Sequence, residues 1–263
     1  MRSCCVIFAS LSILVALGVG SPAGFSPISG TKRIIGGTDA KEGAAPYIVS
    51  LQNYGRHFCG GSIVGDRWIL TAAHCVDGKK SNEVMIQAGT NRLDDSRLPY
   101  PVDLIVSHNL YNRSLKINDI ALIRSSVPLD FSKRIQNIEL ALDPVPDNAT
   151  VTLVGWGRTK REGVLAYKLQ YIELRYVESK RCQEMLEEPV GVGKLCTFIK
   201  KNEGACHGDS GSALTWKGKQ IGIASYIHIN CAAGFPDVFT RVSYYHEWIR
   251  STMAENDNAS DML

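Results

Sequence analysis

The stretch GACHGDSGSAL, residues 204–214, places Ser210 among small residues and next to an acid, Asp209. A serine hydroxyl is a weak nucleophile until a neighbouring base takes its proton, and that base works best when a carboxylate holds its ring. Glycines beside such a serine let a substrate carbonyl approach backbone N–H groups that stabilise a developing negative charge. Gly208 and Gly211 provide this access, so the stretch predicts a nucleophilic site and directs the search to a histidine and an aspartate.

Two residues elsewhere in the chain could complete such a site. His74 stands between an apolar run and a cysteine in LTAAHC, a setting that would hold its ring on a rigid element. Asp119 opens the apolar run DIALIR. Taken singly, His74 could as well be a packed structural residue and Asp119 a turn or capping residue. The residues alone therefore suggest Ser210, His74 and Asp119 as a catalytic set without proving that they meet.

Short apolar segments between turn residues dominate the rest of the chain. Segments of this kind occupy residues 47–52, 67–71, 83–89, 102–108, 119–124, 150–156, 169–177, 195–199, 220–227 and 237–242. Their spacing is typical of strands in barrels or sandwiches, and helical periodicity is limited to 179–186 and 243–253.

A joint rich in proline and aspartate, at residues 142–150, separates these segments into two similar groups. The sequence thus predicts a mainly β protein with one domain at 34–142 and another at 143–250. A polar tail follows at 251–263, and disorder is expected from residue 254 onward.

The first 33 residues differ from the rest of the chain. An uncharged apolar run follows Arg2 and ends in small residues, which predicts a secretory signal peptide at 1–20; the run is short for a membrane anchor, the less favoured alternative. Residues 21–33 are rich in Ser, Pro and Gly and end in Lys32 and Arg33, which indicates a removable pro-segment. A disordered terminus without a role is the alternative.

The chain without these 33 residues has balanced charge and an even number of cysteines. Its acidic and basic residues are equal in number and it has no basic run, which argues against nucleic acid or a membrane as the main partner. Six cysteines remain, and in a secreted protein they are expected to form disulfides. No C-x-x-C pair is among them, so no zinc site is expected, and their spacing leaves the pairing open.

Six short motifs occur in a fixed order along the chain. They are RIIGG (33–37), FCGGSIV (58–64), ILTAAHC (69–75), NDIALIR (118–124), LVGWG (153–157) and GDSG (208–211). This order resembles that of the chymotrypsin-like (trypsin-fold) serine proteases over essentially all of residues 34–250. LCTFIKKNEGAC and FPDVFTRV look most similar to arthropod chymotrypsins. The resemblance implies an all-β fold of two six-stranded antiparallel barrels with a C-terminal helix and the active site between the barrels.

The resemblance also assigns roles to the catalytic candidates. It implies that His74 is the general base, Asp119 the carboxylate that orients it, and Ser210 the nucleophile. The N–H groups of Gly208 and Ser210 would form the oxyanion hole. The implied disulfides are Cys59–Cys75, Cys182–Cys196 and Cys206–Cys231.

The same resemblance gives the pro-segment a purpose. A trypsin-like protease would cleave after Arg33, and the new amine of Ile34 would pair with Asp209, whose buried charge needs a partner. His57 stands where family zymogens hold this aspartate before cleavage; as the alternative it is a strand-end histidine without such a role.

The resemblance also implies that four residues form the pocket for the side chain before the cleaved bond: Gly204, Ser225, Ile227 and Asp237. Relatives that cut after Lys or Arg have an aspartate at the Gly204 position, and Ile227 should narrow the mouth, so apolar or aromatic side chains are expected. Asp237, on the lower wall, could instead attract a basic side chain or stay buried with a raised pKa. Lys116 should border the adjoining subsite and deter basic residues there.

Ser212 and Ala213 stand where the family usually has glycine and proline. These departures suggest an alternative hypothesis, in which the chain is a binding or regulatory protein that has the protease fold but is catalytically weak or inactive. The complete set of His74, Asp119 and Ser210 favours the enzyme.

No calcium site or other cofactor is expected, since the glutamate that usually opens the family's calcium loop is absent after Gly89.

The mature protein is expected to be a secreted, extracellular monomer. Its expected partners are protein or peptide substrates, an activating trypsin-like protease and possible protein inhibitors. Three N-x-[ST] sequons, at Asn112, Asn148 and Asn258, could carry glycans.

Overall fold

A computed structural model describes Met1 and residues 34–260. The signal peptide expected at 1–20, apart from Met1, and the pro-segment expected at 21–33 therefore lie outside the described residues, Arg33 included. None of the helices in the described part of the chain is long and apolar enough to cross a membrane.

The first half of the described chain forms a closed antiparallel barrel. Its strands, in the order in which they pair, are β2 (Ile48–Asn53), β3 (Arg56–Ile63), β4 (Trp68–Thr71), β7 (Ala121–Ser125), β6 (Tyr100–Ser107) and β5 (Met85–Ala88). A short helix, α1 (Ala73–Val76), and the 3-10 turn η1 (Ser81–Glu83) connect β4 to β5. Large apolar side chains such as Trp68, Leu51 and Ile123 fill the interior and are fully buried.

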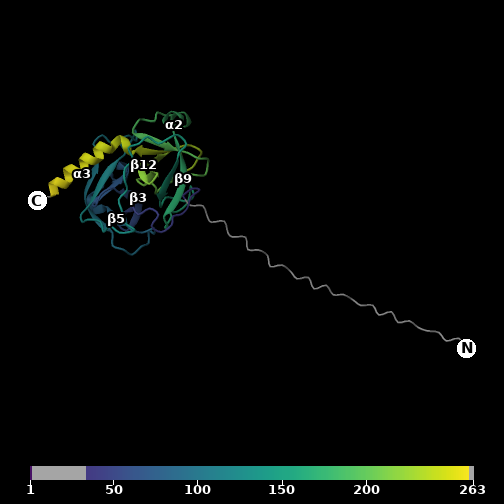
Figure 1. Cartoon of the computed structure of the whole chain (residues 1–263), viewed down its shortest axis with the longest axis horizontal. Coiled ribbons are helices and arrows are strands. Elements are labelled where there is room, and N and C mark those ends of the chain that lie inside the picture. The colour runs from purple at the N-terminus through teal and green to yellow at the C-terminus, as the bar shows by residue number, and fades with distance from the viewer. Residues whose placement is uncertain (2–33, 261–263) are drawn as a thin grey trace. The chain divides into compact units, whose positions relative to one another are not determined.

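The second half forms another antiparallel barrel (Figure 1). Its pairing order is β8 (Thr150–Gly155), β9 (Gln170–Val177), β10 (Lys194–Thr197), β13 (Asp237–Arg241), β12 (Lys219–Ile227) and β11 (Ala213–Trp216), which pairs with β8 again. A short strand, β1 (Thr38–Asp39), adds to the edge of β9. The expected fold of two six-stranded barrels is therefore confirmed.

Helix α2 (Ser179–Leu186) follows β9 at the residues that the sequence predicts. The Glu178 side chain accepts a hydrogen bond from Arg181 N at 3.4 Å, which satisfies one of the free N–H groups at the start of the helix. Cys182 and Leu186, four residues apart and thus on one face, are the buried residues. The helix ends where Glu187 takes a left-handed conformation.

The C-terminal helix is longer than expected. The 3-10 turn η2 (Val242–Tyr245) leads into α3 (His246–Ser260), so disorder from residue 254 onward is wrong for residues 254–260. The polar residues of this segment find partners on the first barrel: Trp68 Nε1 donates to Asp257 Oδ1 at 2.9 Å, and Arg124 Nη1 donates to Asn256 O at 2.7 Å. With Ile249 packed in the core of that barrel, these bonds hold the helix in place.

Two strands of the barrels, β3 and β11, have no counterpart among the strands expected from apolar patterning. In β3 the reason is glycine, which lowers strand propensity but allows close packing. A Cβ at Gly61 would lie 2.7 Å from Ile69 Cγ2, and one at Gly60 would meet Ser212 Oγ. Glycine is thus required by the packing of β3 against its neighbours.

The start of the continuous segment 34–260 lies against the second barrel. Ile34 is fully buried in the core of that barrel, and Ile35 forms a bridge in which its carbonyl accepts Gly204 N at 2.9 Å.

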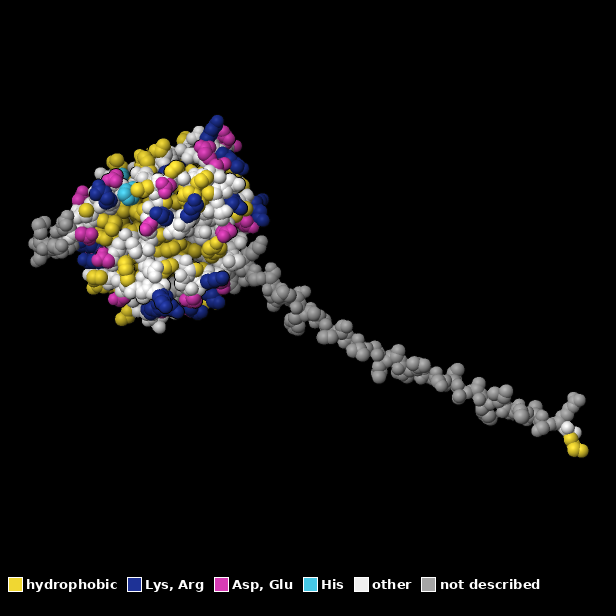
Figure 2. Space-filling model, in the orientation of Figure 1, with side chains coloured by type: hydrophobic (Ala, Val, Ile, Leu, Met, Phe, Trp, Pro, Cys, Tyr) yellow, Lys and Arg dark blue, Asp and Glu magenta, His cyan; other side chains and the backbone are white. Residues whose placement is uncertain are grey.

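On the face shown in Figure 2, acidic and basic side chains are interspersed, with hydrophobic side chains between them. No field of a single charge therefore covers this face.

Candidate active site

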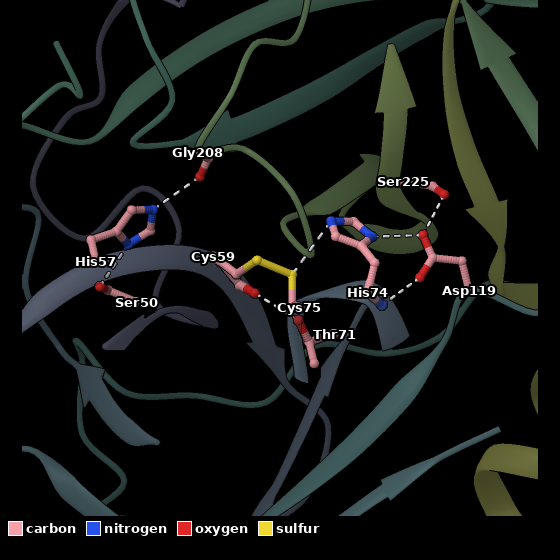
Figure 3. The surroundings of a disulfide bond; sticks show 10 residues. Ser50, His57, Cys59, Thr71, His74, Cys75, Asp119, Gly208 and Ser225 are labelled. Atoms are coloured by element: carbon pink, nitrogen blue, oxygen red, sulfur yellow. Dashed lines mark hydrogen bonds and ion pairs between the residues drawn. A yellow bond between two sulfur atoms is a disulfide. The ribbon is translucent and has the colours of Figure 1, made fainter. Parts of the chain in front are cut away.

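Strand pairing brings His74 and Asp119 together. β4 pairs with β7 in a register that places Thr71 opposite Ala121. His74 follows the end of β4 in α1, and Asp119 precedes β7, so both lie at the same end of this strand pair. Asp119 Oδ1 accepts the backbone N–H of His74, and Oδ2 accepts the ring N–H of His74 at Nδ1, each at 2.8 Å (Figure 3).

The second barrel also binds Asp119. Ser225 in β12 donates its hydroxyl to Asp119 Oδ2 at 2.5 Å, and Thr240 in β13 donates to the carbonyl of Asp119 at 2.7 Å. Burial alone would raise the pKa of Asp119, but the hydrogen bonds from His74 and Ser225 outweigh it, so the pKa lies below the usual value. The carboxylate thus stays ionised and fixed between the barrels, with the His74 ring held in one orientation.

Ser210 is linked to this pair through the backbone of β3. Its carbonyl accepts Gly60 N at 2.8 Å, and the neighbouring Cys59 forms a disulfide with Cys75, which follows His74 in α1. His74 Nε2 lies 3.7 Å from the Cys75 sulfur (Figure 3). The Ser210 hydroxyl forms no hydrogen bond with another described residue, so the structure joins His74 directly to Asp119 and connects Ser210 to them only through the backbone.

Two backbone N–H groups beside Ser210 are without an acceptor among the described residues, those of Gly208 and Ser210 itself. The carbonyls of the same two peptide units are engaged elsewhere: His207 O accepts Arg158 N at 2.8 Å, and Asp209 O accepts Ser212 N at 3.0 Å. In a trans peptide the N–H points opposite to the C=O, so both N–H groups point away from these donors. They are free to bind a negatively charged oxygen.

Glycine is required at position 208. Gly208 has φ +99°, a conformation that side chains rarely adopt, and a Cβ there would lie 2.4 Å from Leu165 Cδ2. The free N–H of Gly208 therefore depends on the absence of a side chain.

His57 does not hold Asp209, contrary to the zymogen contact expected for it. His57 Nε2 lies 2.9 Å from Gly208 O and Nδ1 lies 2.8 Å from Ser50 Oγ (Figure 3). Burial lowers the pKa of His57, so the ring is neutral, with one nitrogen donating to the carbonyl and the other accepting from the serine. The contact instead fixes the Gly208–Asp209 peptide next to the free N–H groups.

The Asp209 side chain is buried without a cation among the described residues. Its oxygens accept Gly157 N at 2.8 Å and Cys206 N at 3.0 Å. Burial raises the pKa of Asp209 to about 7, and the two backbone donors offset this only in part. The carboxyl group is therefore placed to accept a positive charge.

A cavity of about 230 Å³ opens beside Ser210. Its lining includes three of the expected pocket residues, Ser225, Ile227 and Asp237, together with His207. Ile227 is half-buried and packs against the core of the second barrel.

Gly204, the fourth expected pocket residue, lies against the carboxyl group of Asp237. A Cβ at Gly204, which has φ +150°, would lie 2.4 Å from Asp237 Oδ2. That oxygen accepts Ala205 N at 2.7 Å. Burial raises the pKa of Asp237 to about 8, so at neutral pH the group is mostly protonated. Asp237 thus takes the space that a side chain at Gly204 would need.

Ser212, which stands where chymotrypsin-like proteases usually have glycine, is accommodated without backbone strain. It is fully buried and is not among the residues with positive φ, and its hydroxyl has no hydrogen-bond partner among the described residues. The hydroxyl faces Gly60 and Gly155, where side chains would collide with it. Nothing in this packing disturbs His74 or the free N–H groups.

One group of residues has the spacing of a metal site without its chemistry. The ligand atoms of Cys59, His74 and Cys75 lie within 4.8 Å of one another, but the two sulfurs are bonded to each other and offer no thiolate. In the loop at Gly89, where the family's calcium site would begin, Arg97 donates to the Gly89 carbonyl and pairs with Asp95 at 3.3 Å.

The remaining disulfides join Cys182 to Cys196 and Cys206 to Cys231. The first ties α2 to β10. The second joins the segment before Ser210, where Cys206 lines the cavity, to the loop after β12.

Comparison with known proteins places these features in a family. The family model described as trypsin matches residues 34–249. Chymotrypsin-2 of Vespa crabro is 41% identical over 218 residues, which cover 82% of this chain and 98% of that protein. Trypsin epsilon of Drosophila erecta is 33% identical over 254 residues, or 93% of this chain and 97% of that protein. Trypsin eta of Drosophila melanogaster is 33% identical over 260 residues, or 93% and 96%.

Proposed function

Because the chain belongs to the trypsin family of serine proteases and is a serine endopeptidase, we propose that it is secreted as a zymogen and cuts proteins or peptides after apolar or aromatic residues. The observation that carries this proposal is the His74–Asp119 pair, locked by Ser225, beside two free backbone N–H groups at Ser210.

The proposed reaction follows from these contacts. The Nδ1–H of His74 donates a hydrogen bond to Asp119 and keeps its proton, so Nε2 carries no proton and can accept one from Ser210. Ser210 Oγ then attacks the substrate carbonyl carbon, and the oxygen that becomes negative is bound by Gly208 N and Ser210 N. The imidazolium, stabilised by Asp119, gives its proton to the departing amine. Water then gives a proton to His74 and attacks the carbonyl carbon of the acyl group, and His74 returns the proton to Ser210 Oγ as the carboxylic acid product leaves.

Covalent labelling tests the proposed nucleophile. A phosphonylating serine reagent should label the activated protein at Ser210 alone, because only this hydroxyl has both a base and an oxyanion site. Mass spectrometry of the digested protein would locate the label. A correctly processed protein that stays unlabelled would support the alternative of an inactive protease-fold binding or regulatory protein.

Activation is proposed to follow cleavage between Arg33 and Ile34 by a trypsin-like protease. The burial of Ile34 in the second barrel and the unpaired, buried Asp209 support it: a new ammonium group there would offset the cost of ionising this carboxylate. A signal peptide at 1–20 and an extracellular, monomeric product that protein inhibitors can block complete the proposal.

The preference for apolar residues is proposed from the cavity beside Ser210. Ile227 contributes apolar surface and narrows the space, and Asp237 is mostly neutral at pH 7 because its pKa is raised to about 8. A neutral carboxyl group gives a cationic side chain no charge partner, so Leu, Met, Phe or Tyr should be preferred over Lys or Arg.

The preference for apolar over basic residues before the cleaved bond is expected to change with pH. Asp237 gains charge as the pH rises through about 8, while an arginine substrate stays cationic throughout. For two peptides that differ only in Arg or Leu before the cut, the Arg/Leu ratio of kcat/KM should therefore rise about tenfold between pH 7 and pH 9. The ratio cancels ionisations that affect both peptides equally.

The matched variant is Asp237→Asn, which keeps the size of the side chain and removes its charge. Its Arg/Leu ratio should be constant over the same range. A constant ratio in the unmodified enzyme, or an equal rise in the variant, would show that Asp237 does not control the preference.

A further inference from the structure

A second cavity lies next to the catalytic pair, His74 and Asp119. It measures about 220 Å³, and its lining comprises His74, Tyr111, Arg113, Lys116, Asp119, Ser225 and Tyr226. Ser225 and Tyr226 line both cavities. A peptide held along this part of β12 would therefore contact both.

The edge of β12 is open where the two cavities meet. β13 pairs with one edge of β12 as far as Ile227, but β11 pairs with the other edge only as far as Ile223. No strand of the described chain pairs with residues 225–227 on that second edge. An extended peptide can add to such an edge, and its successive side chains then point to opposite sides. When one residue fills the cavity beside Ser210, the residue before it faces the second cavity.

Two lysines approach the ring of Tyr226, and one of them, Lys116, lines the second cavity. Lys116 Nζ lies 4.3 Å from the centre of the Tyr226 ring, and Lys194 Nζ lies 5.0 Å from it. Lys194 also donates to the Tyr226 hydroxyl at 3.2 Å, and this hydroxyl donates to Glu188 at 2.9 Å. Lys194 therefore has an acid nearby that raises its pKa, although burial lowers it more.

Lys116 differs from the other cations of this cavity. Arg113 pairs with Asp77 at 2.8 Å. Lys116 is exposed and forms no ion pair with a described residue, and its backbone has φ +50°, a conformation that is uncommon for a lysine. Its charge is thus held over Tyr226, at the rim of the cavity, without neutralisation from the chain.

We propose that Lys116 determines specificity by binding an acidic side chain, Asp or Glu, at the second residue before the cleaved bond. This rests on the proposed function, since it assumes that the residue in the cavity beside Ser210 precedes the cut. An acidic side chain supplies the missing counter-charge of Lys116, whereas a basic one is repelled by it. The enzyme therefore selects peptides with an acid followed by an apolar residue.

Three peptides that differ only in Glu, Gln or Lys at this second position, all with Leu before the cut, test the proposal on the trypsin-activated enzyme. The kcat/KM for Glu should exceed that for Gln by about threefold, as expected for a partly exposed ion pair, and Lys should be the slowest. Because salt screens exposed charges, the Glu/Gln ratio should fall towards one in 0.5 M NaCl.

Two variants and a control locate the effect. Lys116→Gln should bring the Glu/Gln ratio to about one, and Lys116→Glu should reverse the order of the Glu and Lys peptides. Lys133→Gln, which removes an equal charge from an exposed position that does not line the cavity, should keep the ratio of the unmodified enzyme.

The outcomes separate this proposal from the proposed function. Cleavage of the Gln peptide without a preference for Glu, or a preference that persists in Lys116→Gln, would overturn the role of Lys116 and leave the protease assignment intact. Failure to cleave any of the three peptides after processing at Arg33 would overturn both.

Discussion

Replacing Ser210 with alanine should lower kcat by about 10⁵-fold or more, while folding and secretion stay nearly unchanged. The hydroxyl forms no hydrogen bond with another described residue, and its carbonyl bond to Gly60 does not need the side chain. Removing the hydroxyl therefore eliminates the nucleophile without removing a hydrogen bond that stabilises the barrels. Turnover of a peptide with leucine before the cut measures the loss, and circular dichroism measures the fold.

His74→Ala should cause a loss of similar size, and the double variant should be no slower than either single variant, because nucleophile and base act as one unit. Additive losses would indicate that His74 and Ser210 act independently. Residual turnover within tenfold of the unmodified enzyme in Ser210→Ala, after exclusion of contaminating protease, would contradict the assignment of Ser210.

Replacing Arg33 with glutamine should give a secreted precursor whose activity stays about 10²- to 10³-fold below that of the processed enzyme, the size of loss expected when an oxyanion site is not formed. Without cleavage there is no Ile34 amine, so Asp209 has no cation to pair with and its pKa remains near 7. Activity after treatment with trypsin, together with N-terminal sequencing, measures the effect.

Arg33→Lys is the matched control, since trypsin cuts after either basic residue, and it should be activated normally. Inserting the recognition sequence of an unrelated protease directly before Ile34 in the Arg33→Gln variant should restore activity when that protease is added. Full activity of the uncut precursor would show that Asp209 does not need the amine.

The sequence predicted the parts of the fold whose residues form apolar or alternating runs or follow a helical period. In β9 alternate residues face inward and outward, and in α2 the buried residues are four apart, so both were located closely. β3 was missed because the glycines that let it pack against Ile69 and Ser212 remove the apolar pattern. The helical end of α3 was missed because its partners on the first barrel are far away in sequence.

In the candidate site too, residues in local motifs could be predicted from the sequence, but contacts between distant segments could not. His74, Asp119 and Ser210 could be singled out because each stands in a distinctive motif, but Ser225 Oγ was not expected as a donor to Asp119, since only the closing of the two barrels brings these residues together. The raised pKa of Asp237 was among the expected alternatives, because a carboxyl group in an apolar pocket has few ways to keep its charge. The approach of Lys116 and Lys194 to the Tyr226 ring depends on three separate segments and has no local pattern.

The two ends of residues 34–260 pack on opposite barrels. Ile34 precedes the first barrel in sequence but is buried in the second, whereas α3 follows the second barrel and is held on the first by Trp68 and Arg124. Neither barrel can thus lose its structure without exposing apolar surface that a segment from the other end of the chain covers. The barrels are expected to unfold in one cooperative transition, with no lasting intermediate in which only one of them is folded. The distance between His74 on one barrel and Ser210 on the other is then maintained by the stability of the whole domain, and a substitution that destabilises either barrel is expected to disrupt the site on both.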